Sequence, residues 1–414
     1  MNAVFGRADG AILDLPRYRA AVDDGAIRVA TPADFIPLPR DALLLTLPGR
    51  TPIAFADARR AEISELEGSQ IDAVAAALPP GYTRTLLPAY AERPGCRPLP
   101  LYGYAAVAWH EGGLRVAARA TDELPDWSPQ THSSSAVRAG IDRLSSEFAG
   151  NSLIRQLAVC ANEYGCYTAQ NVFLRQGEAA IPVSLACNAQ CIGCISKQIP
   201  DEGVQAAQER VTRQPSVEEI VAVALAHLRE VRKAIISFGQ GCEGEPLLAA
   251  PRIEAAIRAI RKSTNAGTLH CNTNASRPKA LVRLLQAGLQ SIRVSLNSVR
   301  PEAYAAYYRP QGYDFSDVRE SLRLAAERGA AISLNLLTHP GVTDVPEEVE
   351  AFREFLCDYP IAMVQTRTLN VDPARYFAAV GRPKRQPLGM ARWLTWLSRE
   401  FPGVRVGNFT RGFG

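Results

Sequence analysis

Residues 181–198 read IPVSLACNAQCIGCISKQ, and this stretch decides how the chain is interpreted. It holds Cys187, Cys191 and Cys194 in a CxxxCxxC spacing. An iron–sulfur cluster that only transfers electrons usually takes four protein cysteines, so three thiolates leave one iron of a 4Fe-4S cluster open to another ligand. The apolar run at residues 181–186 predicts a buried strand before the loop, and parallel α/β folds carry their reactive groups at the carboxyl ends of such strands.

The cysteine spacing resembles that of the radical S-adenosylmethionine (SAM) superfamily. The resemblance implies that SAM completes the cluster and is cleaved reductively to a 5'-deoxyadenosyl radical, which abstracts hydrogen from a substrate. It also implies one 4Fe-4S cluster held by the three cysteines, and an external electron donor such as flavodoxin or ferredoxin. One position departs from the family pattern, because the residue before the third cysteine is commonly aromatic there and is Gly193 here.

A zinc site, or three unrelated core cysteines, is the competing interpretation of the motif. Structural zinc normally takes four ligands, often as two CxxC or His pairs. No second CxxC or HxxxH pair follows the motif in the sequence. The sequence therefore favours the iron–sulfur cluster.

From residue 181 onward, patterns typical of strands and helices alternate, as repeated βα units require. A capping-box pair, Ser216 and Glu219, opens the first long helix, and further helices are predicted at residues 278–288 and 315–329. The strand candidates are residues 181–186, 235–239, 268–274, 291–297, 332–338 and 363–369, with residues 404–409 as a seventh. The six units match the α/β core that the resemblance implies, a partial (βα)6 TIM-like barrel.

The faces of these strands indicate what the sheet encloses. In residues 291–297, Ile292, Val294 and Leu296 form one alternating set, and a polar set begins at Arg293. The apolar set would meet the helices and the polar set the interior. A closed eight-stranded barrel fills its centre with branched apolar residues, so a polar interior predicts an open barrel that holds a polar ligand.

The next landmark is GQGCEGEPLL at residues 239–248, after the second strand candidate. It resembles the superfamily's GGE motif, which binds the SAM amino group. Carried over position by position, Gly244 and Glu245 match, and Glu243 replaces the first glycine. Glycine suits this motif because the backbone must approach the ligand closely.

The resemblance also implies that polar residues at the ends of the fourth and fifth strands contact the SAM ribose and carboxylate. Ser295, Asn297 and Asn335 occupy those positions. For each of them, the alternative is a strand-end side chain that caps nearby backbone.

Catalytic candidates near the expected active mouth are Cys242, His339 and Arg367. Cys242 would quench a substrate radical, anchor a substrate or ligate an auxiliary cluster, and a buried small hydrophobe is the alternative, which we favour for Cys271. Arg367 suits a carboxylate or phosphate because its planar fork binds either one bidentately. A salt bridge with an acidic neighbour is the alternative role for Arg367. Other substrate-site candidates by position are Gln365, Asn370 and Asp372.

We expect two domains, an amino-terminal α/β domain over residues 1–175 that shapes substrate access, and the core with a carboxyl-terminal segment over residues 176–414. Residues 101–120 predict a hairpin, and the Pro-, Ser- and Asp-rich residues 121–135 predict a loop and hinge before a helix from about Ala136.

Two cysteines stand shortly before the cluster strand. Cys160 and Cys166 would help to ligate an auxiliary cluster, or they are ordinary thiols. In a continuous helix, a spacing of six would put the two thiols on different faces, which disfavours a shared metal.

The composition indicates the compartment in which the protein works. Nine cysteines in 414 residues do not form a small secreted framework, so they are expected to be reduced or metal-bound. The first residues lack a basic segment followed by an apolar run, and no stretch approaches eighteen apolar residues. We therefore expect a soluble, cytoplasmic protein with no membrane partner.

Net charge is +4, yet from Arg367 onward nine Lys or Arg residues oppose two acidic ones. These charges favour either solvated helix faces or a surface for an anionic partner or substrate. Nucleic acid is the less favoured partner because the basic residues are dispersed and lack interleaved aromatic residues.

The sequence thus predicts a SAM-cleaving radical enzyme whose substrate is unknown. A nonenzymatic iron–sulfur protein for electron transfer or sensing is the alternative, and it would not need Glu245 or a polar interior. An RNA-modifying member of the same superfamily is the weaker alternative, with RNA binding that depends steeply on salt.

Overall fold

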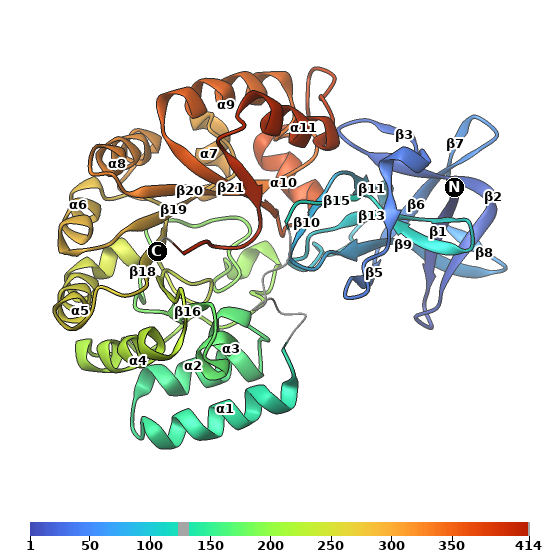
Figure 1. Cartoon of the computed structure of the whole chain (residues 1–414). Coiled ribbons are helices and arrows are strands. Elements are labelled where there is room, and N and C mark those ends of the chain that lie inside the picture. Colours follow the sequence, from blue (N-terminus) through green and yellow to red (C-terminus); the bar gives the residue numbers. More distant parts are fainter. Residues whose placement is uncertain (123–131, 413–414) are drawn as a thin grey trace.

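The computed structural model describes residues 1–122 and 132–412. Figure 1 shows two regions side by side, a β-rich region at the amino terminus and a larger α/β region in which helices form an outer arc around the strands. In the described part of the chain, no helix combines the length and apolarity that crossing a membrane requires.

The α/β region is built on a seven-stranded parallel sheet whose strand order is the order of the chain. Its strands are β16 (Glu178–Ile181), β17 (Ile235–Phe238), β18 (Thr268–Thr273), β19 (Ser291–Leu296), β20 (Ala331–Thr338), β21 (Ile361–Thr368) and β22 (Arg405–Gly407). Every strand predicted from residue 235 onward is confirmed, and so is the seventh strand near the carboxyl terminus.

Helices alternate with these strands, and most of them cover the outer side of the sheet, while α10 (Pro373–Val380) lies between the sheet and the β-rich region (Figure 1). They are α4 (Val217–Glu230), α5 (Ala250–Ser263), α6 (Pro278–Ala287), α7 (Pro301–Tyr308), α8 (Phe315–Glu327), α9 (Pro346–Asp358), α10 (Pro373–Val380) and α11 (Met390–Glu400). Short 3-10 turns occur at η3 (Pro200–Glu202) and η4 (Pro246–Ala249). The capping box predicted for α4 is confirmed, since Ser216 accepts from the Glu219 amide and Glu219 from the Ser216 amide.

The strand before the cysteines ends earlier than predicted. β16 stops at Ile181, and its last register partner is Phe238. Beyond this point the backbone pairs with a loop instead of a strand, because the Gly244 amide donates to the Ser184 carbonyl at 2.9 Å. The expected strand at residues 181–186 is therefore mostly an extended segment that is bound by the loop after β17.

The β-rich region is antiparallel throughout. Its main sheet runs β12-β6-β2-β1-β9-β13-β14-β4, with β3, β5, β7, β8 and β11 attached and β10 and β15 paired separately. The strands are β1 (Asn2–Arg7), β2 (Ile12–Asp23), β3 (Ile27–Val29), β4 (Ile36–Pro37), β5 (Leu43–Leu47), β6 (Arg50–Ala56), β7 (Arg59–Glu62), β8 (Glu65–Leu66), β9 (Ser69–Ala77), β10 (Tyr82–Arg84), β11 (Leu87–Pro88), β12 (Tyr90–Glu92), β13 (Ala105–His110), β14 (Gly113–Val116) and β15 (Ala118–Ala120). A 3-10 turn, η1 (Pro32–Asp34), lies among them.

The predicted hairpin is confirmed as β13 and β14. His110 pairs with Gly113, and the two residues between them, Glu111 and Gly112, both have positive φ. Two successive positive φ values are typical of the tight turn that fits the twist of a hairpin.

The mixed α/β pattern expected for residues 1–175 is instead segregated. Strands occupy residues 2–120, and the helices α1 (Ser134–Glu147), α2 (Ser152–Asn162) and α3 (Tyr167–Leu174) follow. These helices join the α/β region, since the Ser152 hydroxyl donates to Glu219 of α4 and the Asn171 side chain donates to the Glu178 carbonyl. The expected hinge falls largely on residues 123–131, outside the described residues. We propose that the two regions divide between Asp122 and His132.

Buried polar contacts attach the β-rich region to the end of β21. Arg50 donates to Asp372 at 2.8 Å, and both side chains are almost fully buried. Asp372 also accepts from the Leu99 amide at 2.8 Å, and the hydroxyls of Thr83 and Thr366 lie 2.6 Å apart. Asp372, a substrate-site candidate by sequence, is therefore occupied by contacts between the two regions.

Candidate active site

A pocket of about 580 Å³ opens at the carboxyl ends of the parallel strands. Loops that follow β16, β17, β18 and β21 line one side of it, and inward-facing residues of the strands line the other. In β19, Arg293 and Ser295 line the pocket while Ile292, Val294 and Leu296 are fully buried, so the predicted division of faces is confirmed.

The cysteine loop lies against this pocket and is fixed by backbone contacts. Cys187 and Cys191 line the pocket. The Cys194 amide donates to the Cys191 carbonyl at 3.1 Å, and the Cys194 sulfur accepts from Arg210 at 3.5 Å. The amide of Ile192 donates to the Tyr307 carbonyl at 3.0 Å, which ties the loop to α7.

The environment of the three thiols fits a multi-iron cluster. Burial raises the pKa of Cys187, and burial and the neighbouring thiols raise the pKa of Cys191 well above its usual value. Thiolates in such a place need positive charge beside them, which bound iron supplies. Among the described residues, no three His, Cys, Asp or Glu side chains stand close enough to hold one metal ion. Structural zinc normally takes four ligands, whereas three cysteines can each bind a different iron of a cluster, so the donor set of three cysteines fits a cluster better than zinc.

The loop after β17 packs directly on the cysteine loop. A Cβ at Gly244 would lie 1.9 Å from the Ala186 carbonyl oxygen, so only glycine fits there. The Glu245 amide donates to the same carbonyl at 2.8 Å. Contact between the two loops thus accounts for the glycine of the sequence motif.

Glu243 holds the two loops together, a role that the sequence motif did not indicate. One carboxylate oxygen accepts from the amides of Val183 and Ser184 at 2.8 and 2.6 Å, and the other accepts from the Gln240 amide at 2.8 Å. Burial raises its pKa to about 7. The only signal in the sequence was a glutamate where the family pattern has glycine, and it did not reveal the partners.

Glu245 is bound in a similar way but lines the pocket. It accepts from the amides of Leu247 at 3.0 Å and Asn274 at 2.8 Å and from the Thr273 hydroxyl. Burial raises its pKa to about 7. Two carboxylate oxygens offer about four acceptor positions, so three donors leave one position for a ligand.

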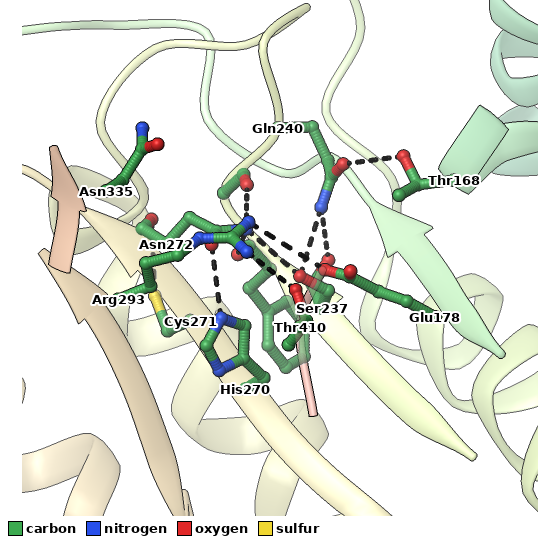
Figure 2. Close-up of polar contacts among 12 residues, drawn as sticks. Thr168, Glu178, Ser237, Gln240, His270, Cys271, Asn272, Arg293, Asn335 and Thr410 are labelled. Carbon is green, nitrogen blue, oxygen red and sulfur yellow. Dashed lines mark hydrogen bonds and ion pairs between the residues drawn. The ribbon is translucent and has the colours of Figure 1, made fainter. Parts of the chain in front are cut away.

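A buried polar network lies on the strand side of the pocket (Figure 2). Arg293 donates to Thr410 at 2.6 Å and lies 4.0 Å from Glu178, whose side chain is 1% exposed. Burial alone would raise the pKa of Glu178, but the Arg293 charge, together with His270 and the hydroxyls of Thr410 and Ser237, lowers the pKa. Glu178 is therefore a carboxylate that pairs with Arg293.

Side-chain amides complete this network. Asn272 donates to the Ser237 hydroxyl at 3.0 Å and to the Gly239 carbonyl at 2.7 Å. Gln240 donates to the Ser237 carbonyl at 2.9 Å and accepts from Thr168 at 3.1 Å. Figure 2 shows Gln240 reaching from the loop toward Ser237, so the network links the loop side of the pocket to its strands.

Arg367 has a different partner from Arg293. It lines the pocket and donates to the Tyr167 hydroxyl at 3.1 Å. In residues 1–122 and 132–412, no carboxylate forms an ion pair with it. The alternative of a salt bridge for Arg367 is thus not realised, and its guanidinium remains available to an anionic group.

Residues 181–356 match the family model of the radical SAM superfamily. The match begins at the end of β16 and includes the three cysteines, Gly244 and Glu245. Residues 181–356 form a domain of the radical SAM superfamily.

Two curated relatives share this part of the chain. The chain is 26% identical over 237 residues to a GTP 3',8-cyclase of Heliobacterium modesticaldum, covering 56% of this chain and 67% of the relative. It is 27% identical over 181 residues to a GTP 3',8-cyclase of Petrotoga mobilis, covering 43% of this chain and 51% of the relative. The matches thus span about two thirds and about half of the relatives' lengths.

Solved structures of radical SAM proteins are also similar at low identity. A radical SAM methyltransferase from Sphaerobacter thermophilus matches at 17% identity with a TM-score of 0.39, covering 56% of this chain and 65% of that one. Methylornithine synthase matches at 13% identity with a TM-score of 0.39, covering 64% of this chain and 73% of that one.

As a radical SAM enzyme, the protein uses a 4Fe-4S cluster and SAM, acts on a substrate and takes electrons from an external donor. The nonenzymatic alternative finds no support, because both curated relatives are named as enzymes. Of the residues that the sequence assigned to SAM, Gly244, Glu245, Ser295 and Asn335 line the pocket.

Two predicted site residues lie elsewhere. Asn297 is 1% exposed and donates to the Ala303 carbonyl and the Tyr376 hydroxyl, both at 3.0 Å, so it caps neighbouring structure. His339 is fully buried beyond β20, with its ring against Tyr376 and Phe377. A position just after a strand does not ensure that the side chain faces the pocket. Asn297 follows β19 and His339 follows β20, yet neither lines the pocket.

Some of the remaining candidates line the pocket and others do not. Asn370 and Cys242 line the pocket. Gln365 is 1% exposed and is not among the lining residues, and Cys271 is fully buried in the core, as favoured from the sequence. Sequence reasoning missed Glu178 and Tyr167, because both lie before the expected cluster strand and reach the pocket only through the fold.

Some basic residues of the carboxyl-terminal part form ion pairs. Arg375 pairs with Glu202, Arg382 with Asp23 and Arg411 with Asp122. Ion pairs within the protein thus account for three of the nine basic residues counted from Arg367 onward.

Proposed function

We propose that this protein cleaves SAM reductively at a 4Fe-4S cluster held by Cys187, Cys191 and Cys194, and uses the product to abstract hydrogen from an anionic small-molecule substrate. The observation that carries the proposal is that the cysteine loop, Glu245 and a polar strand face line one pocket. We propose that the curved parallel sheet is the partial (βα)6 barrel of this reaction.

Cys187, Cys191 and Cys194 would hold the cluster, which would supply the electron for cleavage of SAM to methionine and a 5'-deoxyadenosyl radical. The chain's own residues bind and orient. Gly244 allows the loop backbone to approach, Glu245 accepts from the SAM amino group, and Ser295 and Asn335 offer hydrogen bonds to its ribose and carboxylate.

The substrate would lie on the strand side. Arg367 binds one anionic group, with the Tyr167 hydroxyl fixing its guanidinium. Glu178 forms its ion pair with Arg293, whereas Arg367 forms no ion pair among the described residues and feels the charges of Glu178 and Asp122 only at longer range. The hydrogen to be abstracted would then face the SAM site across the pocket.

Both curated relatives are named for GTP, so a nucleoside triphosphate must be considered as the substrate. The charged side chains that line the pocket are Glu178, Glu245, Arg293 and Arg367, two of each sign. A triphosphate carries several negative charges, and burying them without matching cations costs heavily. The pocket therefore favours a substrate with a single anionic group over GTP.

The test is anaerobic reconstitution, followed by incubation with SAM and dithionite and chromatography of 5'-deoxyadenosine. The wild type should form it, Cys191→Ala should not, and Cys357→Ala, on the exposed side of α9, is the matched control. Glu245→Ala should retain the cluster but bind SAM more weakly. Full cleavage by a folded Cys191→Ala variant would contradict the proposal.

The physiological electron donor is proposed to be a flavodoxin or ferredoxin. Replacing dithionite by either protein with its reductase should sustain 5'-deoxyadenosine formation. If neither protein reduces the enzyme while dithionite does, another donor serves it.

A further inference from the structure

An arginine outside the sequence motif contacts one of the motif's cysteines. The Arg210 guanidinium donates from Nη2 to the Cys194 sulfur at 3.5 Å and from Nε to the Ser196 hydroxyl at 3.3 Å. Neither Arg210 nor Cys194 is among the residues that line the active-site pocket. Arg210 therefore approaches the cysteine loop from outside the pocket that Gly244 and Glu245 line.

The chain on either side of Arg210 is fixed by backbone hydrogen bonds. The Gln208 amide donates to the Ile195 carbonyl in the cysteine loop at 3.0 Å. The Val211 amide donates to the Cys242 carbonyl in the loop after β17 at 2.8 Å. The segment before α4 thus holds the guanidinium in place through the backbone around it.

Ser196 extends the contact between Arg210 and the cysteine. It is 5% exposed, and its hydroxyl oxygen lies 3.8 Å from the Cys194 sulfur. Because this oxygen accepts from Arg210, the hydroxyl hydrogen can be donated to the sulfur. Cys194 therefore has one direct donor and a second donor that Arg210 orients.

The positive charge of Arg210 is not neutralised by an ion pair. In residues 1–122 and 132–412, no carboxylate forms an ion pair with its guanidinium. Burial raises the pKa of Cys187 and of Cys191, and the Arg210 charge acts on both in the opposite direction. One cation thus influences all three thiols of the motif.

A cation in this place has a definite effect on an iron–sulfur cluster. Reduction adds one negative charge to a group whose three protein ligands are already anionic. A nearby positive charge and hydrogen bonds to the sulfurs stabilise the more negative form, so they raise the reduction potential. Their removal should make the cluster harder to reduce, although every iron ligand remains.

We propose that Arg210 is a positioning residue of the cluster, which orients Cys194 and raises the potential at which the cluster accepts its electron from the external donor. The inference rests on a 4Fe-4S cluster at the three cysteines and not on the identity of the substrate. Arg210 stands sixteen positions after Cys194, so the cysteine spacing does not indicate it.

The experiment compares reduction potentials of the reconstituted enzyme without SAM or substrate, by redox titration followed by EPR. Arg210→Met removes the charge and both donors. At a fixed potential, the ratio of reduced to oxidised cluster should fall about tenfold, which is a shift of about 59 mV to lower potential for a one-electron couple. Iron and sulfide per chain should stay at the wild-type level because all three cysteines remain.

Matched variants separate the contact from a general effect of charge. Arg213→Met removes an exposed arginine of the same segment and should leave the potential nearly unchanged, because water and salt screen an exposed charge. Arg210→Lys keeps the charge without the planar fork, so its potential should lie between those of the wild type and Arg210→Met. Ser196→Ala removes only the second donor and should lower the potential less than Arg210→Met. Circular dichroism of each iron-free variant checks folding.

Three results would overturn the proposal. The first is a folded Arg210→Met protein with full iron and the wild-type potential, and the second is an equal shift in Arg213→Met. The third is loss of iron in Arg210→Met together with wild-type potentials in Arg210→Lys and Ser196→Ala, which would make Arg210 a structural contact only. The titration does not require SAM cleavage, so an enzyme that shows the shift but forms no 5'-deoxyadenosine would contradict the proposed function alone.

Discussion

The two sides of the active-site pocket are held in different ways. The loop side consists of Cys187, Cys191, Gly244 and Glu245, and backbone hydrogen bonds between the loops fix it. The strand side consists of Glu178, Asn272, Arg293, Asn335 and Arg367, and side chains fix one another there. The loop side should therefore tolerate almost no change, while the strand side can change its ligand without loss of the fold.

The largest effect is expected from Gly244→Ala on the loop side. The new Cβ would meet backbone atoms of Ala186 at 1.9 and 2.4 Å, so the cysteine loop must move. Iron bound at the motif should fall at least tenfold, measured as iron per chain. Gly403→Ala is the control, since a Cβ there meets nothing within 4 Å. Normal iron content in Gly244→Ala would show that the loop contact is dispensable.

On the strand side, Arg367→Met should spare the cluster and SAM cleavage but weaken substrate use. Loss of a charge-assisted hydrogen bond costs about 1.5–3 kcal/mol, or roughly tenfold to a hundredfold in substrate affinity. The measurement is deuterium transfer from labelled candidate acids into 5'-deoxyadenosine. Arg392→Met, on α11 away from the pocket, is the control. Loss of SAM binding in Arg367→Met would instead assign Arg367 to SAM.

Glu243→Gln tests how the loop side is held. The amide side chain keeps one acceptor oxygen but turns an NH₂ group toward a backbone donor, so the free energy of unfolding should fall by about 2–3 kcal/mol. Urea unfolding of the iron-free protein measures it. Glu302→Gln, with a side chain 70% exposed, should change it by less than about 0.5 kcal/mol. If the Glu243→Gln and Glu302→Gln variants are equally stable, Glu243 does not hold the two loops together.

The pH dependence of stability tests whether His270, next to the strand side of the pocket, is buried as a neutral imidazole. Burial lowers its pKa to about 4, with Nδ1 2.8 Å from the Ser291 hydroxyl. The unfolded chain takes up a proton near pH 6.5 and the folded protein does not, so stability is present above pH 6.5 and falls as pH drops toward 4. At pH 5 this loss amounts to about 2 kcal/mol.

His270→Gln should therefore reduce, by the share of one histidine, the pH dependence between pH 6.5 and 4, measured by urea unfolding at each pH. His227, buried on α4 with a pKa also lowered to about 4, provides a matched variant outside the pocket. If His270→Gln keeps the full wild-type slope, His270 is not buried as a neutral imidazole.

The sequence by itself determined the loop side and the order of the strands. Strand and helix periods, the Ser216 capping box and the cysteine spacing are local signals, and each depends on residues that are neighbours in the chain. The resemblance of residues 239–248 to the GGE motif pointed to Gly244 and Glu245, and both line the pocket. Prediction from local position failed at Asn297 and His339, because whether a strand-end side chain faces the pocket depends on where the chain turns next.

Only the tertiary structure decided what the pocket contains. Glu178 pairs with Arg293 across more than a hundred residues, and Tyr167 reaches Arg367. Such contacts are set by sheet register and by how helices pack on strands, and no short-range pattern encodes them. The chemistry of the superfamily can therefore be recognised from one loop, whereas the choice of substrate rests on side chains that only the fold brings together.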